Sequence, residues 1–201
     1  NVVSEPLVGH LRTAPAGRRD ISFVWSGDTA GQGWGINPDA GGMKGYATML
    51  KHDPDFFIHS GDNVYADGVI KAEVDLPDGT KWKNIVTPEK SKVAETLDEF
   101  RGQYKYNFMD ENVRALYAAV PVLTQWDDHE VTNNWSDSKQ LGAAYTEKNI
   151  HVLTARAAKA FHEWMPIATT MAEPQRVYRK IAYGPMLDVF MIDMRTYRGP
   201  N

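Results

Sequence analysis

The chain has 201 residues, of which 42% are hydrophobic, and its formal net charge at pH 7 is -4. This length suffices for one substantial domain but not for two large ones. A negative overall charge argues against nucleic acid as a structural partner, because such partners usually require a basic surface. Cysteine is absent, which excludes disulfides, thiolate ligands and a cysteine nucleophile. A metal site must therefore use oxygen ligands and imidazole, and no apolar run is long enough for a membrane span.

The first residues differ from the rest of the chain. Residues 2–12 alternate between apolar and polar side chains as a strand would, and Pro15 and Gly17 then mark a linker. We interpret residues 1–17 as the end of a preceding domain and residues 18–201 as part of a second one. Because the chain stops shortly after a predicted strand, it is interpreted as a fragment.

The first two predicted strands of the second domain are joined by a helix. Residues 21–27 and 56–61 are apolar runs that lead into Asp28 and Asp62, and the connection 29–52 is rich in glycine before it acquires helical spacing. A strand, a helix and a second strand form a βαβ unit with a right-handed crossover and parallel strands. The sequence therefore predicts an α/β fold with both aspartates at one edge of a parallel sheet.

The remaining elements follow in chain order. Residues 69–88 are predicted to form an insertion loop, a kind of segment that often acts as a lid. The third parallel strand is expected at residues 121–126, and residues 176–183 and 186–194 are expected to pair with each other. The predicted helices are residues 92–108, 112–119 and 146–164.

The third strand ends in four consecutive titratable residues, 127–130. Asp128 and His129 are expected beside Asp28 and Asp62, because parallel strands end at the same edge of a sheet. Such carboxylates repel one another unless a cation or hydrogen bonds compensate their charge. A carboxylate that bridges two metal ions is an arrangement that activates water for attack on phosphorus. Hydrolysis of a phosphate ester is therefore the predicted reaction.

The same residues also fit roles that involve no phosphoester chemistry. An aspartate after a strand often caps the following helix, Tyr65 fits a packing role, and His59 fits a place in the core. A metal-independent glycoside hydrolase with a pair of carboxylates would also place acids at strand ends. The second alternative is a metal-binding module without catalytic activity.

Two blocks of the sequence resemble a known enzyme family. Residues 61–65 (GDNVY) resemble the GDxxY block of the calcineurin-like metallophosphoesterases. Residues 126–135 (WDDHEVTNNW) resemble the WDDHEVxNNW block of their PhoD-type alkaline phosphatase and phosphodiesterase branch. Residues 28–34 are similar to the first metal-binding block of that branch, and residues 193–198 to its DxRxYR segment.

The resemblance implies how the chain is organised. Residues 18–201 would form the N-terminal part of a catalytic domain with an αββα sandwich fold, and residues 1–17 would end an N-terminal β-sandwich domain. A later family block of the type DVHYTAAH has no counterpart after Arg195. The remaining C-terminal half of the same protein is therefore an expected partner. A periplasmic or secreted location is implied, because family members are usually exported.

The resemblance also implies the ligands of a first metal. Asp28 would bind this metal at a position where some relatives have cysteine, and Tyr65 would ligate it as well. Asp62 would bridge the first metal to a second one. The ions implied are Fe3+ at the first site and Ca2+ at the other, with Mn or Zn as alternatives.

The second metal and the substrate involve residues later in the chain. Asp128 is implied as a ligand of the second metal, and Asn134, or else Asn133, would complete that site. His129 matches the histidine that contacts the substrate phosphate and assists the leaving group. Arg195 is expected to bind phosphate, because a guanidinium pairs with phosphate oxygens in a bidentate fork. The expected reaction is in-line attack of a metal-activated hydroxide on a phosphate mono- or diester.

Overall fold

A parallel sheet forms the centre of the computed structural model. The residues it describes are 6, 8–165, 167–168 and 176–200. The sheet has the strand order β1-β2-β5, with β1 (Phe23–Ser26), β2 (Phe56–His59) and β5 (Val122–Thr124). Both neighbouring pairs are parallel. The predicted α/β class is therefore confirmed, and the strand that leads to Asp62 lies in the middle.

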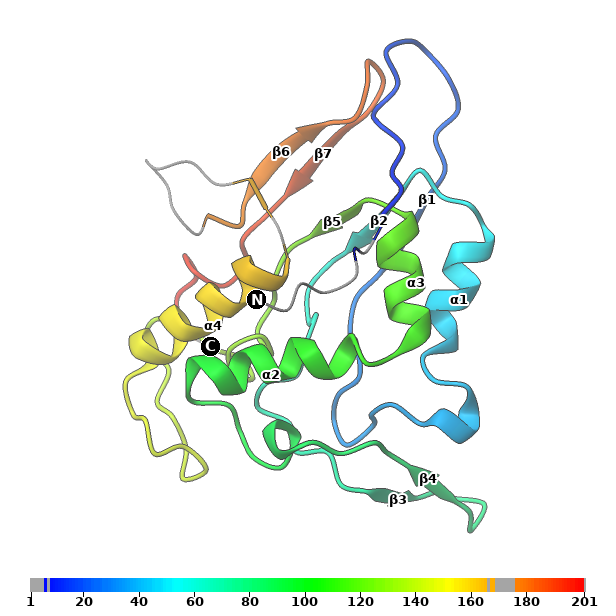
Figure 1. Cartoon of the computed structure of the whole chain (residues 1–201). Helices are drawn as coiled ribbons and strands as arrows, with labels where there is room; N and C mark the ends of the chain where they lie inside the picture. The colour runs from blue at the N-terminus through cyan, green and yellow to red at the C-terminus, as the bar shows by residue number, and fades with distance from the viewer. Residues whose placement is uncertain (1–5, 7, 166, 169–175, 201) are drawn as a thin grey trace.

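The helices form two pairs, and one pair packs on the central sheet. They are α1 (Lys44–Lys51), α2 (Leu97–Asn107), α3 (Glu111–Ala119) and α4 (Ile150–Trp164), with short 3-10 helices η1 (Pro38–Ala40) and η2 (Pro88–Lys90). Figure 1 shows α1 next to α3, the pair that packs on the central sheet, and α2 next to α4. Tyr104 and Trp164 stack between α2 and α4 with ring centroids 6.3 Å apart. Among the described residues, no helix is long and apolar enough to cross a membrane.

Two helices begin later than their hydrophobic spacing predicts, because polar residues cap them. The side chain of Thr96 accepts a hydrogen bond from the backbone of Glu99, whose side chain accepts one from the backbone of Thr96. This capping box starts α2 at Leu97. Asn149 accepts from the backbone of His151 in the same way and starts α4 one residue after itself.

The predicted insertion loop contains a hairpin. Strands β3 (Glu73–Asp75) and β4 (Lys81–Lys83) pair in antiparallel fashion, and Figure 1 shows that they project from the body of the molecule. The base of the excursion is closed where the backbone of Ile70 donates to the carbonyl of Lys90 at 2.8 Å. Residues 69–88 are thus an ordered excursion rather than an irregular loop.

Strands β6 (Arg179–Ala182) and β7 (Asp188–Met191) form the predicted second hairpin. Tyr183, which follows β6, packs on Phe56 of the central sheet with ring centroids 4.6 Å apart. This contact places the hairpin beside the sheet, although the two are not joined by strand pairing among the described residues.

The strand predicted over residues 2–12 is wrong for the part of it that the structure describes. Residues 6 and 8–12 are not in a strand, because alternation alone cannot form one without a neighbouring strand to pair with. The backbone of His10 instead donates to the carbonyl of Ala118 at 2.7 Å. The assignment of residues 1–17 to the end of a β-sandwich domain stays a prediction.

Candidate active site

The predicted site lies where the parallel strands end, and three of its residues have unusual backbone conformations. Asp28, Asp62 and Asn134 have positive φ angles of 59°, 53° and 52°. Asp and Asn tolerate this left-handed region better than other non-glycine residues, but it still carries strain. Thr29 donates a backbone hydrogen bond to the carbonyl of Asp62 at 2.9 Å, which ties the turns after β1 and β2 together. Strained residues of this kind cluster at functional sites.

Gly61 permits the close approach between the ends of β2 and β5. Its φ is 116°, and a Cβ atom there would lie 2.6 Å from Cβ and 2.8 Å from the backbone nitrogen of Asp127. Only glycine combines this φ with this lack of space. The turn before Asp62 therefore lies directly against residues 127–130.

The structure brings Asp62, Asp128 and His129 together, with ligand atoms that all lie within 4.8 Å of one another. Both carboxylates are buried, and the backbone of His129 donates to Oδ1 of Asp62 at 3.2 Å. Burial raises the pKa of Asp62; His129 opposes this shift, and the charge of Asp128 adds to it. A buried carboxylate in this position would be stabilised by a bound cation.

Tyr65 and Asp28 form a pair beside this cluster. The hydroxyl of Tyr65 donates to Oδ1 of Asp28 at 2.5 Å, and its ring stacks on His129 with centroids 4.3 Å apart. Burial, followed by the hydrogen bond to Asp28 and the charge of Asp62, raises the pKa of Tyr65. The three-residue cluster does not include Asp28, so Asp28 is connected to it through Tyr65.

The predicted asparagines reach the site through their backbones. Asn134 donates its N–H to Oδ2 of Asp128 at 2.6 Å, and Asn133 donates its N–H to Oδ2 of Asp67 at 2.6 Å. Both asparagine residues are exposed. The assignment of either side chain as a metal ligand stays a prediction.

Arg195 lies beside the carboxylates with one donor unused. Its side chain is 8% exposed, and Nε donates to Oδ1 of Asp127 at 2.6 Å. Nη2 lies 3.5 Å from Oδ2 of Asp128, whereas the buried Nη1 has no hydrogen-bond partner. Because a buried donor without a partner is costly, Nη1 is suited to an anionic ligand.

Sequence patterns do not single out Asp67, although it orients the predicted catalytic histidine. Its Oδ1 lies 2.7 Å from Nδ1 of His129, while its Oδ2 accepts the backbone bond from Asn133. Burial alone would lower the pKa of His129, but the hydrogen bond and charge of Asp67, with the charges of Asp128 and Asp62, raise it to about 9. The hint in the sequence is that Asp67 lies in the same loop as Asp62.

Glu130 and Lys90 are two further buried titratable residues to which the sequence analysis gives no role. Glu130 accepts from the backbone of Asn63 at 2.6 Å and from the backbone of Asp127 at 2.9 Å, so it joins the turns after β2 and β5. Burial, with the charge of Asp62, raises the pKa of Glu130 to about 8. Lys90 donates to the carbonyl of Tyr65 at 3.0 Å. These contacts hold the backbone of the loops that carry the candidate site residues.

His59 occupies the core, as its position in an apolar run suggests. It is 1% exposed, and its Nε2 lies 2.7 Å from the hydroxyl of Thr29. Burial lowers the pKa of His59 to about 4. A neutral histidine that holds the turn after β1 is consistent with a structural role.

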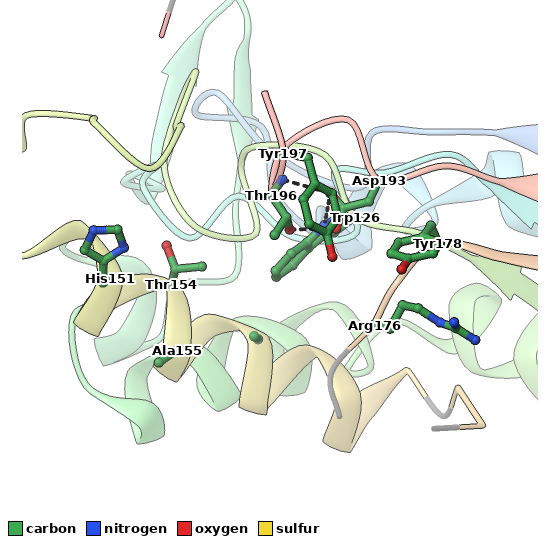
Figure 2. A pocket seen from close by; sticks show the side chains of 10 residues that line it. Trp126, His151, Thr154, Ala155, Arg176, Tyr178, Asp193, Thr196 and Tyr197 are labelled. Carbon is green, nitrogen blue, oxygen red and sulfur yellow. Dashed lines mark hydrogen bonds between the residues drawn. The ribbon is translucent and has the colours of Figure 1, made fainter. Parts of the chain in front are cut away.

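A pocket of about 420 Å³ is lined by Trp126, by residues of α4 and by residues of the segment 193–197. It is separate from the acidic cluster. Figure 2 shows Trp126, Asp193 and Thr196 near one another, with His151 and Thr154 of α4 away from them. The indole of Trp126 donates to Oδ1 of Asp193 at 3.1 Å. None of the predicted metal ligands lines this pocket, so the acidic cluster does not act there.

Comparisons with known proteins agree with the resemblance. A family model described as PhoD-like phosphatase matches residues 23–201. Alkaline phosphatase D from Bacillus subtilis (strain 168) is 26% identical over 194 residues, which cover 95% of this chain and 31% of the relative. A solved structure of PhoD is similar with a TM-score of 0.70 and 26% identity, covering 93% of this chain and 34% of its own. The chain thus spans about a third of the length of these relatives, as expected for one portion of a larger α/β enzyme.

Proposed function

The chain belongs to the PhoD-like phosphatase family, and we propose that it provides the acidic part of a metal-dependent site that hydrolyses phosphate mono- or diesters. The observation that carries this proposal is the cluster of Asp62, Asp128 and His129, whose ligand atoms lie within 4.8 Å of one another. Because the chain spans only about a third of its relatives, the activity is proposed for the whole protein.

The residues of the site fit cations. Asp62 and Asp128 are buried close together, and the phenol of Tyr65 lies against Asp28. We assign Asp28 and Tyr65 to a first metal, Asp62 to a bridging position, and Asp128 with Asn134 to a second metal. Bound cations would supply activation of water and neutralise charge on the phosphoryl oxygens. Fe3+ and Ca2+ are the proposed ions, with Mn or Zn as alternatives.

Two side chains of this chain would act on the substrate directly. We assign Arg195 to a phosphoryl oxygen, where a guanidinium counters negative charge, because its buried Nη1 has no protein hydrogen-bond partner. His129 is held by Asp67 through Nδ1, which leaves Nε2 for the leaving oxygen. Against the effect of burial, the hydrogen bond and charge of Asp67 raise the pKa of His129, which favours the protonated ring and suits His129 to donate a proton as a general acid.

The alternative functions make different predictions. A carboxylate-pair glycoside hydrolase keeps its activity after exhaustive chelation, whereas a non-catalytic module binds cations without turnover. The family match favours phosphoester hydrolysis over both. Export to the periplasm or the medium stays a prediction.

The proposal is tested by Asp62→Asn in the full-length protein. Loss of the bridging carboxylate is expected to lower hydrolysis of bis(4-nitrophenyl) phosphate at least about a hundredfold and to reduce bound metal, because both ions would share this ligand. Asp39→Asn is the matched control, since Asp39 is an exposed residue 3.9 Å from Lys83. Unchanged hydrolysis by the Asp62 variant would refute the proposed site.

The Tyr65 assignment has its own readout. Ligation of ferric iron by a tyrosinate produces visible charge-transfer absorption, which Tyr65→Phe is expected to abolish while the protein stays folded. A colourless wild-type protein that does not take up iron would exclude the ferric assignment without affecting the proposed hydrolysis.

A further inference from the structure

Two tryptophans form a partly exposed pair, one of them in the loop that begins at Asp28, and the proposed chemistry uses neither. Trp34 lies in the loop after β1 and is 42% exposed. Its ring meets that of Trp82 in β4 edge to face, with centroids 5.8 Å apart. A side chain of this size is usually well buried, and aromatic residues left accessible are enriched where proteins bind ligands and partners.

One side chain holds both tryptophan-bearing segments in place. The amide oxygen of Asn84 accepts from the backbone of Gly35 at 2.8 Å and from the indole of Trp82 at 2.7 Å. Its amide nitrogen donates to the carbonyls of Gly33 at 2.9 Å and Lys71 at 2.8 Å. Figure 1 shows the loop after β1 and the hairpin β3–β4 on the same side of the molecule. Asn84 therefore fixes the indole of Trp82 and the backbone on both sides of Trp34, which lowers the entropy cost of binding.

The pair lies close to Tyr65. Gly31 packs so tightly on the Tyr65 ring that a Cβ atom would lie 2.1 Å from its Cγ. The backbone of Trp34 donates to the carbonyl of Gly31 at 3.0 Å, which closes a turn, and the Cα atoms at the ends of such a turn are less than about 7 Å apart. The backbone of Trp34 therefore lies within roughly 10 Å of the Tyr65 ring, close enough for a substrate group beside Tyr65 to reach the indole.

We propose that Trp34 and Trp82 form an aromatic wall that binds a planar ring in the alcohol that stays esterified to phosphate after cleavage. The inference rests on the proposed phosphoesterase function and deepens it, because it names the substrate class: phosphodiesters with an aryl or nucleobase-bearing alcohol. Arg195 and cations held by the carboxylates would bind the charged phosphate, while the wall offers apolar ring surface. Stacking on aromatic side chains is favourable for any planar ring.

The test compares three diesters that share the 4-nitrophenolate leaving group and carry methyl, phenyl or thymidin-5′-yl as the second alcohol. In the full-length protein, Trp34→Ala and Trp82→Ala are each expected to raise KM about fivefold or more for the ring-bearing diesters. The KM of the methyl diester and all kcat values should stay the same. An effect on the phenyl diester identifies aryl alcohols as ligands, and an effect confined to the thymidine diester identifies nucleosides.

Controls separate the wall from the fold and from the catalytic proposal. Trp34→Phe and Trp82→Phe keep a ring and should retain the wild-type KM values, as should Val86→Ala, an exposed apolar residue of the same excursion. Equal effects on the methyl and ring-bearing diesters, or no effect at all, would overturn the wall. If the wild type hydrolyses neither these diesters nor the monoester 4-nitrophenyl phosphate, the proposed function fails instead. The wall is then tested by calorimetry, with phenyl phosphate expected to bind about fivefold more weakly to Trp34→Ala.

Discussion

At the scale of single residues, the orientation of the His129 ring and the stability of its charged form depend on the contact with Asp67. The carboxylate 2.7 Å from Nδ1 orients the ring and stabilises its charged form, which an amide cannot do. Asp67→Asn is therefore expected to lower kcat for a phosphodiester about 10- to 100-fold, with a smaller change in KM. Steady-state kinetics check this, with Asp137→Asn, an exposed residue of the following loop, as the control. An unchanged kcat would restrict Asp67 to supporting the backbone at Asn133.

Gly61 allows a direct test of the geometry around Asp62. Its φ of 116° and the 2.6 Å approach to Cβ of Asp127 leave no room for a side chain. Gly61→Ala is expected to lower the free energy of unfolding by about 2–4 kcal/mol, because backbone strain and a steric clash add together. Urea denaturation measures this, with Gly142→Ala as control, since a Cβ atom at Gly142 meets nothing within 4 Å. Equal stability of both variants would contradict the proposed crowding.

At the scale of secondary-structure elements, the capping box of α2 predicts a pH-dependent stability. Burial alone would raise the pKa of Glu99, but hydrogen bonds from Lys92 and from the backbones of Thr96 and Glu95 lower it to about 2. A carboxylate with a lowered pKa stabilises the fold above its unfolded pKa, and this contribution is lost as the pH falls through the folded value.

Glu99→Gln is thus expected to lower the free energy of unfolding by about 1–2 kcal/mol at pH 7. The difference from wild type should shrink as the pH falls from 4.5 towards 2. Denaturation curves at pH 7 and at about pH 3 measure it. Glu111→Gln in the first turn of α3 is the control, and only a few tenths of a kcal/mol are expected there. A difference that stays constant with pH would rule out the charge of Glu99 as its cause.

At the scale of the whole molecule, large apolar side chains remain at the surface of the sheet and of the second hairpin. Trp25 of β1 is 70% exposed and Phe190 of β7 is 68% exposed. Exposed apolar patches of this kind mark contact surfaces, and the relatives are about three times as long as this chain, which covers 31% of one of them. We therefore expect further polypeptide to cover Trp25 and Phe190 in the full-length protein.

This expectation is measured with a hydrophobic dye. Residues 1–201 alone should bind anilinonaphthalene sulfonate and self-associate, whereas the full-length protein should do so much less. Trp25→Ser combined with Phe190→Ser should reduce dye binding by about half. Val8→Ser, at an exposed apolar residue of the N-terminal segment, should have little effect. Equal dye binding by both lengths of chain would show that these side chains stay exposed.

The fold could be predicted from the sequence wherever a local pattern determines it. Apolar runs that lead to Asp28, Asp62 and Asp128 form three parallel strands, and they could be predicted because apolar composition and run length are local properties of the sequence. Helix starts were less predictable, since the caps at Thr96 and Asn149 override the hydrophobic spacing. The strand expected over residues 2–12 failed in its described part because pairing requires a neighbour.

The sequence by itself determined the α/β class, the family resemblance and the acids at the strand ends. Only the tertiary structure decided how these groups are connected: Asp28 contacts Tyr65, while Asp62 joins Asp128 and His129. It also assigned partners to Asp67 and Glu130, whose hydrogen bonds reach residues 62 and 67 positions away. The physical reason is that hydrophobic periodicity indicates which face of an element is apolar, whereas the packing of distant turns determines which side chains meet.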